Sequence, residues 1–221
     1  MPPRRLTDDY LHLGHRRRLV AHLRTRGIDD EATLAAIGRV PRHYFVSRAH
    51  EARAYEDRAL PIGDGQTISQ PYTVAYQTSL LRAAPRQKVL EVGTGSGYQA
   101  AVLGAMGLRV FTLERHEGLY RDARALFAAG GFGDVRCLLR DGGKGLPAYA
   151  PFERILVTAG AQDVPAALID QLAPGGILVI PVGVDVQVMK RVTKRADGGA
   201  DVEDLGEFRF VPFLKGVASA R

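Results

Sequence analysis

The sequence predicts an α/β fold, a Rossmann-like three-layer arrangement with a mostly parallel sheet, a terminal antiparallel hairpin and an N-terminal helical cap. From residue 85 onward, short apolar strands alternate with helical sequence, the pattern of a parallel sheet covered by helices on both faces. Two helical stretches precede this region, and no repeat or low-complexity linker divides the chain. We therefore expect a single domain over residues 1–221, with a cap in residues 1–84 and an α/β core in residues 85–221.

Two helices are predicted at the start of the cap. The first covers Thr7–Thr25, where apolar residues recur at helical spacing and Gly27 supplies a stop signal. Asp29 or Asp30 can cap a second helix, which runs through Ile37 and ends at a Val-Pro pair. These helices come before the main fold along the chain.

A polar stretch, Gly63–Pro71, is predicted to form a turn ahead of the core. Its hydroxyl groups and backbone N–H groups can hold a carboxylate, which makes it a candidate for gripping a substrate. Thr73–Leu81 follows as a helix that ends before Pro85.

The core is predicted to contain five parallel strands followed by a hairpin. The two hairpin stretches are joined across a turn containing Asp197-Gly198-Gly199. The predicted strands are Lys88–Val92, Arg109–Leu113, Val135–Leu139, Arg154–Thr158 and Ile177–Pro181, with Val186–Lys194 and Glu203–Phe213 forming the hairpin.

Composition narrows the class of protein. The 221 residues are 46% hydrophobic and 24% charged, which is ordinary for a globular protein. No apolar run approaches the roughly 20 residues of a membrane-spanning helix, and Met1–Arg5 leads into Arg- and His-rich sequence without a signal-peptide core. We expect a cytoplasmic monomer without membrane contact. Cys137 stands among apolar residues and is interpreted as a buried strand position and not as a nucleophile.

The net charge of +6 permits attraction to acidic partners such as nucleic acid. The densest basic cluster, His15–Arg18, lies on a predicted helix without the interleaved aromatic residues that stack bases, so we interpret it as a solvated face. His12 and His15 share that helix, but the neighbouring sequence offers no third ligand. We predict neither a nucleic-acid partner nor a metal site.

Three glycines follow the first core strand at every second position: Gly93, Gly95 and Gly97. Glycines at such a place let the main chain turn tightly and approach a ligand, while the start of the following helix offers free N–H groups. The loop predicts a nucleotide-like cofactor.

Two cofactor classes compete for this loop. A dinucleotide fingerprint requires a glycine where Tyr98 stands, and Glu91 suits a positively charged amino group better than a pyrophosphate, so S-adenosylmethionine is favoured over a nicotinamide cofactor. Glu114 can accept hydrogen bonds from ribose hydroxyls in either class. Asp141 can accept from an adenine amino group beside Gly142, although an aspartate there is equally typical of a turn.

Three segments together resemble the protein-L-isoaspartate O-methyltransferases, a family of class I S-adenosylmethionine-dependent enzymes. The glycine loop alone indicates only a class I methyltransferase, whereas the segment around Gly65–Pro71 is what narrows the resemblance to this family. Similarity continues in further segments to residue 212, so the resemblance spans nearly the whole chain. The three segments are Val40–Val46, Ala59–Pro71 and Val89–Ala100.

The resemblance implies roles for particular residues. Ser69 stands at the position regarded as the active-site residue, within a substrate segment that also lies over the cofactor. One departure is that Arg140 precedes Asp141 where the family commonly has glycine, which puts the local backbone in doubt. The cofactor positions implied by the resemblance and by the glycine loop are Gln66, Thr67, Ile68, Glu91, Gly93, Gly95, Gly97, Glu114, Asp141 and Gly142.

The implied activity is methyl transfer from S-adenosylmethionine to the free carboxylate of L-isoaspartyl residues in damaged proteins and peptides, leaving S-adenosylhomocysteine. The methyl ester then closes to a succinimide, which begins repair. An isoaspartyl carboxylate is already ionised near neutral pH, so no general base is needed, and Ser69 is expected to donate a hydrogen bond that positions it.

Three alternatives remain open at this stage. The first is a class I methyltransferase acting on a dedicated peptide, a small molecule or RNA. The second is an NAD-dependent oxidoreductase, and the third is a sensor that binds the cofactor without turnover.

Overall fold

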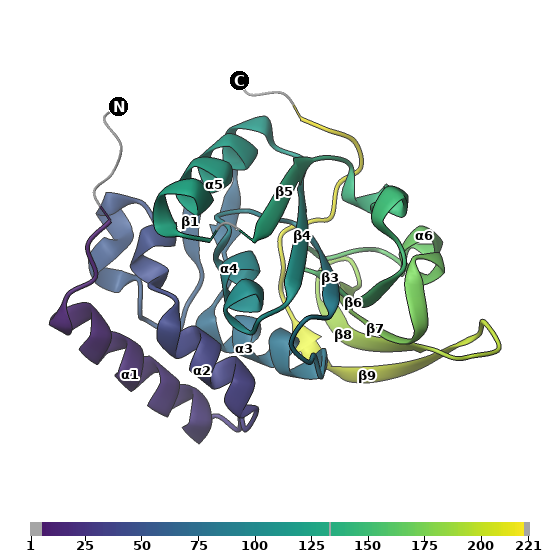
Figure 1. The fold of residues 1–221 in the computed structure, drawn as a ribbon, viewed down its shortest axis with the longest axis horizontal. Coiled ribbons are helices and arrows are strands. Elements are labelled where there is room, and N and C mark those ends of the chain that lie inside the picture. The colour runs from purple at the N-terminus through teal and green to yellow at the C-terminus, as the bar shows by residue number, and fades with distance from the viewer. Residues whose placement is uncertain (1–5, 133, 219–221) are drawn as a thin grey trace.

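The computed structural model describes residues 6–132 and 134–218, so the Met1–Arg5 start used above lies outside the described residues. A seven-stranded sheet with the order β5-β4-β3-β6-β7-β8-β9 forms its centre (Figure 1). The first five strands of that order run parallel, and β8 and β9 continue the sheet antiparallel. The predicted mostly parallel sheet with a terminal hairpin is confirmed. The strands are β3 (Lys88–Val92), β4 (Arg109–Glu114), β5 (Val135–Leu139), β6 (Phe152–Val157), β7 (Leu172–Val182), β8 (Gln187–Lys194) and β9 (Ala200–Phe208).

Helices cover both faces of the sheet, so the core has two apolar layers. Val89 packs in the layer under the cap helices, α4 and α5, while the next residue, Leu90, packs in the layer under α6 and the short 3₁₀ turns. In Figure 1 the cap helices α1 and α2 lie side by side at one end of the molecule. The helices are α1 (Tyr10–Thr25), α2 (Glu31–Arg39), α3 (Pro71–Leu80), α4 (Tyr98–Ala105), α5 (Glu117–Gly130) and α6 (Ala166–Asp170), and the 3₁₀ turns are η1 (Arg42–Phe45), η2 (Arg48–Arg53), η3 (Gly142–Lys144) and η4 (Pro147–Tyr149).

Aspartates begin both cap helices. The Asp9 carboxylate accepts hydrogen bonds from the backbone N–H groups of Leu11 and His12, so α1 starts three residues later than predicted. Asp30 accepts from Thr33 N at 3.0 Å and caps α2, as one of the two predicted candidates. Within residues 6–132 and 134–218, no helix combines the length and apolar character needed to cross a membrane.

The stretch predicted as a turn, Gly63–Pro71, is in part a β-strand, so that prediction is wrong at Gln66–Ile68. Strand β1 (Leu60–Gly63) pairs antiparallel with β2 (Gln66–Ile68). Asp64 and Gly65 form the hairpin turn with φ of 50° and 69°. Positive φ at both central residues is the geometry that an Asp-Gly pair favours, because it matches the twist of a hairpin.

The end of the chain also differs from the prediction. Strand β9 ends at Phe208, five residues before the predicted end, and residues 209–218 form a segment that we call the C-terminal strap. The strap leaves the sheet edge and crosses toward β4 (Figure 1), where Ala218 N donates to Arg115 O at 2.8 Å. On the way, Gly160 N donates to Val211 O and Phe213 N donates to Gly160 O, each at 2.8 Å.

The strand order places a switch point beside β3. From β3 the chain moves outward through β4 to β5, and then returns to β6 on the opposite side of β3. In such sheets a crevice opens at the carboxyl ends of the strands on either side of the reversal. The ends of β3, β4 and β6 are therefore where the fold positions a ligand.

We expect the cap and core to unfold together, because one apolar layer joins them. Leu34 of α2 is 1% exposed within that layer. Leu34→Ala should lower the free energy of unfolding by about 2–5 kcal/mol in a single urea transition followed by circular dichroism. Val184→Ala, a control at a 74% exposed position, should change it by less than about 0.5 kcal/mol. Two separate transitions would contradict a shared core.

Candidate functional site

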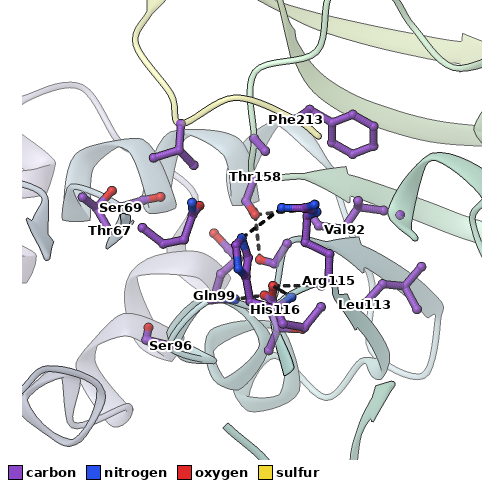
Figure 2. A pocket seen from close by; sticks show the side chains of 18 of the residues that line it. Thr67, Ser69, Val92, Ser96, Gln99, Leu113, Arg115, His116, Thr158 and Phe213 are labelled. Atoms are coloured by element: carbon purple, nitrogen blue, oxygen red, sulfur yellow. Dashed lines mark hydrogen bonds between the residues drawn. The ribbon is translucent and has the colours of Figure 1, made fainter. Parts of the chain in front are cut away.

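A cleft opens at the carboxyl ends of β3, β4 and β6, beneath the β1–β2 hairpin and the strap. It contains about 830 Å³ of empty space, part of it open to solvent. Figure 2 shows Thr67 and Ser69 on one side of the cleft and Leu113 and Arg115 on the other. The lining includes eight of the eleven residues singled out in the sequence, namely Gln66, Thr67, Ile68, Ser69, Gly93, Gly95, Glu114 and Gly142.

The glycine loop forms the floor of the cleft. Gly93 has a φ of 101°, and a Cβ added there would lie 2.4 Å from Thr158 Oγ1. That hydroxyl donates to the carbonyls of Val92 at 3.1 Å and Gly93 at 2.7 Å, so it joins the end of β6 to the end of β3. The contact therefore admits only glycine at position 93.

The Glu114 carboxylate lies at the end of β4, and only 4% of the residue is exposed. One of its oxygens accepts from Gly95 N at 2.8 Å, and the other accepts from the N–H groups of Arg115 and His116, each at 2.8 Å. These bonds fix the acid against the glycine loop. A carboxylate oxygen can accept two hydrogen bonds, so Glu114 keeps acceptor capacity toward the cleft that it lines.

Ser69 reaches the cleft from the cap side, in the link between β2 and α3. It is half-buried, and Figure 2 shows its side chain beside Thr67 at the cleft wall. Its backbone carbonyl accepts from Arg42 Nη2 at 2.7 Å. Pro71 at the first position of α3 ends the link, since proline has no N–H to leave unpaired there.

Ile62 of β1 packs against the glycine loop, so the β1–β2 hairpin lies over that loop. A Cβ at Gly95 would lie 3.4 Å from Ile62 Cδ1, an approach as close as ordinary side-chain packing allows. The strap closes the other side with Val211, Pro212 and Phe213. The cleft is thus built by the cap, the core and the strap together.

Glu91, predicted to meet the cofactor, does not line the cleft. It alternates with Val92 along β3, so its side chain lies on the opposite face of the sheet, beside its register partner Thr112. The residue is 0% exposed, and neither carboxylate oxygen has a hydrogen-bond partner among the described residues. Burial raises the pKa of Glu91 to about 8. The acid is therefore largely protonated at neutral pH.

Cys137 lies on the same face, in the strand position that the sequence predicted. Cys137 of β5 is the register partner of Thr112 of β4, and it is half-buried. Burial raises the pKa of its thiol to about 12, which leaves almost no thiolate at neutral pH.

Gly97 and Asp141 also lie outside the cleft lining. Gly97 has a φ of 89°, and a Cβ there would lie 2.7 Å from the Phe127 ring, so this glycine lets α5 pack against the loop. Asp141 Oδ1 accepts from Gly143 N at 3.0 Å and caps η3, the turn-forming use that the sequence also allowed. Its contact with adenine stays a prediction, while its neighbours Arg140 and Gly142 line the cleft.

The fold gathers a polar cluster in the cap that the sequence did not reveal. Asp8, His12 and His43 offer ligand atoms within 4.8 Å of one another, so a third residue does lie near His12. However, Arg16 occupies both Asp8 oxygens at 2.8 and 2.7 Å. His43 donates from Nε2 to a backbone carbonyl and accepts at Nδ1 from Tyr55. Both ring nitrogens of His43 are thus engaged and the Asp8 charge is already paired with Arg16, so the cluster is a poor candidate for metal ligation.

Sequence reasoning missed several lining residues. Thr158 stood at the end of a predicted strand, but its role depends on β6 lying next to β3, which the sequence did not establish. Val211 and Phe213 were assigned to the terminal hairpin, so the strap that covers the cleft was not predicted. Arg115 and His116 directly follow Glu114, and their position after a core strand was the one signal available.

The residues that line the cleft fit the adenosine part of a nucleotide-like cofactor. The backbone comes close at Gly93 and Gly95, and Glu114 is held where ribose hydroxyls can donate to it. Leu113 and Phe213 supply apolar surface of the kind that accommodates an adenine ring.

Known proteins match this chain over nearly its whole length. The family model described as Protein-L-isoaspartate(D-aspartate) O-methyltransferase (PCMT) matches residues 14–218. A protein-L-isoaspartate O-methyltransferase of Cytophaga hutchinsonii is 52% identical over 210 residues, which cover 95% of each chain. The enzyme of that name from Salinibacter ruber is 51% identical over 94% of this chain and 95% of its own. A solved PCMT structure from Plasmodium falciparum, in complex with S-adenosyl-L-homocysteine, has a TM-score of 0.80 and 25% identity, covering 91% of this chain and 99% of that chain.

The buried Glu91 carboxyl makes stability depend on pH. Its pKa is near the ordinary glutamate value of 4.5 in the unfolded chain and about 8 in the folded protein. Between these values the folded protein holds a proton that the unfolded chain has released, so the stability contributed by Glu91 falls as pH rises. The glutamine of the Glu91→Gln variant does not titrate. The free energy of unfolding of the variant minus that of the parent should therefore increase from pH 4.5 to 8, by an amount on the order of 3–5 kcal/mol.

Urea unfolding across this pH range measures the difference. Glu207→Gln, which changes an exposed glutamate on β9, serves as the control and should show a nearly constant difference from the parent. A pH-independent difference for Glu91→Gln would mean that Glu91 has the same pKa in the folded and unfolded protein, which would contradict the prediction.

Proposed function

The chain belongs to the protein-L-isoaspartate(D-aspartate) O-methyltransferase family, and we propose that it transfers a methyl group from S-adenosylmethionine to the free carboxylate of L-isoaspartyl residues in damaged proteins and peptides. The match covers residues 14–218, which include both the cap and the core. The observation that carries the proposal is that Ser69, from the cap, lines the same cleft as the core glycine loop. A substrate carboxylate and the cofactor can therefore meet in one cavity.

That shared cleft also supports the proposal of a single methyltransferase domain over residues 1–221. The cap supplies the substrate segment, and residues 85–221 supply the cofactor-binding core. A monomeric state, location in the cytoplasm and the absence of a nucleic-acid partner stay predictions from the sequence.

The core residues are proposed to hold the cofactor. The backbone at Gly93 and Gly95 would approach its methionine part, Glu114 would accept from the ribose hydroxyls, and Gly142 would leave room beside the adenine ring. When bound, the cofactor supplies an electrophilic methyl group on a sulfonium centre. The core residues therefore need only to bind and orient the cofactor, and no proton transfer is required of them.

The cap residues are proposed to hold the substrate. An isoaspartyl carboxylate is ionised near neutral pH and is itself the nucleophile. The Ser69 hydroxyl would donate a hydrogen bond to one carboxylate oxygen and leave the other free to attack. Aligning the reacting atoms at about 3–3.5 Å converts the encounter into an intramolecular step. The hairpin and strap, which roof the cleft, would keep water from competing.

The product of this step is a methyl ester beside a backbone amide. The amide nitrogen can displace methanol and close a succinimide ring, whose hydrolysis yields either normal aspartyl or isoaspartyl linkage. Repair of damaged proteins would follow from repeated rounds, with the enzyme responsible only for the ester.

Transfer of labelled methyl groups to matched substrates tests the proposed function. We expect base-labile methyl ester on a peptide containing one L-isoaspartyl residue, and at least about 100-fold less on the same peptide with normal aspartate, because the carboxylate then lies one methylene away from the reacting position. RNA and free dicarboxylic acids should accept no label. Preferential methylation of RNA or a small molecule would contradict the proposal, as would calorimetric binding of a nicotinamide cofactor without S-adenosylmethionine binding.

Removing the Ser69 hydroxyl tests its positioning role. A hydrogen bond to a charged group contributes about 1.5–3 kcal/mol, so Ser69→Ala should lower kcat/KM for the isoaspartyl peptide about 10- to 100-fold. Ser79→Ala is the matched control, because Ser79 lies on α3 and donates to Tyr76 O away from the cleft. Equal activity of Ser69→Ala and the parent would remove Ser69 from the mechanism.

A further inference from the structure

Arg42 is a fully buried cation directly behind the substrate segment. It lies in η1, is 0% exposed, and donates to three backbone carbonyls. Its Nε donates to Ala54 O at 2.9 Å, and its Nη2 donates to Ser69 O at 2.7 Å. A longer contact joins Nη2 to Arg58 O at 3.5 Å. Burial lowers the pKa of Arg42 to about 10, so the side chain remains charged at neutral pH.

The same guanidinium touches the cofactor side of the cleft. Its central carbon lies 4.8 Å from the centre of the Tyr98 ring. Tyr98 is buried, begins α4 immediately after the glycine loop, and lines the cleft. Arg42 is thus the side chain that contacts both the Ser69 link and the residue that follows the glycine loop.

Asp57 holds the other end of the same link. Its carboxylate accepts from Tyr72 N at 2.8 Å and from Arg26 at 2.7 Å, and its carbonyl accepts from the Gln70 side chain at 3.1 Å. Although burial opposes it, the pKa of Asp57 is lowered by these N–H donors, so the carboxylate stays ionised. The backbone that follows the Ser69 Cα is therefore held at two points, the Ser69 carbonyl and the Tyr72 N–H, by residues of the cap.

Holding the Ser69 carbonyl restricts rotation about the Cα–C bond of Ser69, and the pairing of Ile68 with Leu60 holds the chain just before it, so together they restrict where the Ser69 side chain can point. We propose that Arg42 is a positioning residue for methyl transfer, which holds the Ser69 link so that its hydroxyl faces the substrate carboxylate. This inference rests on the proposed function, since it assigns a task within that reaction. Arginine suits the task because its planar fork can reach several carbonyls at once, whereas a lysine ammonium is a single point.

A positioning role predicts a loss of activity without an equal loss of cofactor affinity. Arg42→Lys keeps the positive charge but removes the planar guanidinium group that reaches several carbonyls. We expect it to lower kcat for the isoaspartyl peptide about 10- to 100-fold, the effect of losing a hydrogen bond to a charged group. The dissociation constant for S-adenosylhomocysteine should change less than about threefold.

Arg16→Lys is the matched control. Arg16 is a second buried arginine of the cap, 2% exposed, which donates to Gly38 O at 3.0 Å and pairs with Asp8 without lining the cleft. Its replacement disturbs cap packing in a similar way and should change kcat less than about threefold. Thermal unfolding of both variants identifies a temperature at which each is fully folded, and all assays are made there.

A double variant tests whether Arg42 acts through Ser69. If it does, Arg42→Lys combined with Ser69→Ala should lose much less activity than the product of the two single losses. Full multiplication of the losses would overturn the proposal, as would equal effects of Arg42→Lys and Arg16→Lys, or a loss of S-adenosylhomocysteine affinity as large as the loss of kcat.

Arg42→Met provides a second route if the lysine variant does not fold, because it fills similar volume without burying a charge. Arg42→Met should likewise lower kcat while leaving the dissociation constant for S-adenosylhomocysteine nearly unchanged. Failure of both variants to fold, with Arg16→Lys folded, would assign Arg42 to structure alone and overturn the proposal. Failure of the parent protein to methylate the isoaspartyl peptide would instead contradict the proposed function.

Discussion

The contact between Thr158 and Gly93 is the constraint on which the rest of the site depends. At this point the sheet divides, with β4 and β6 lying on opposite sides of β3, and the Thr158 hydroxyl bonds the carbonyls at the end of β3. The missing Cβ at Gly93 allows that approach. The loop beyond Gly93 is then held by the Glu114 carboxylate, so the floor of the cleft is set by hydrogen bonds that the protein makes with itself. A ligand of suitable shape meets a surface that is already organised, which reduces the ordering cost of binding.

The cap completes this site from outside the sheet. Its apolar residues join those of α4 and α5 in one continuous layer, and its hairpin carries Ile62 over the loop. Two polar side chains, the buried Arg42 and the half-buried Asp57, then hold the link that carries Ser69. Stability and positioning are therefore supplied by different residues of the same cap. Apolar burial attaches it to the core, while the polar contacts set the backbone direction at the cleft.

Much of this could be predicted from the sequence, because local signals and the final structure agree. The bounds of β3 and β5 match the prediction, since apolar runs there are flanked by breaking residues. Eight of the eleven residues singled out line one cleft. The glycines and the acid among them follow core strands and carry their own chemical signal, whereas the roles of Gln66–Ser69 came from the family resemblance. The exceptions depend on information that is not local. Neighbouring residues of a strand face opposite sides of a sheet, and only the placement of the cleft decides that Val92 and not Glu91 lines it. The strap could not be predicted either, because its partners at Gly160 and Arg115 are distant in sequence.

The central claim is that the cap link and the core loop form one reaction cavity. A crystal structure of the protein with S-adenosylhomocysteine and an isoaspartyl peptide tests it most directly. The account predicts the ribose at Glu114, the sulfur facing the substrate carboxylate, and the Ser69 hydroxyl within about 3.2 Å of a carboxylate oxygen. A peptide carboxylate bound away from Ser69, or a cofactor bound outside the cleft formed by Gly93 and Gly95, would contradict it.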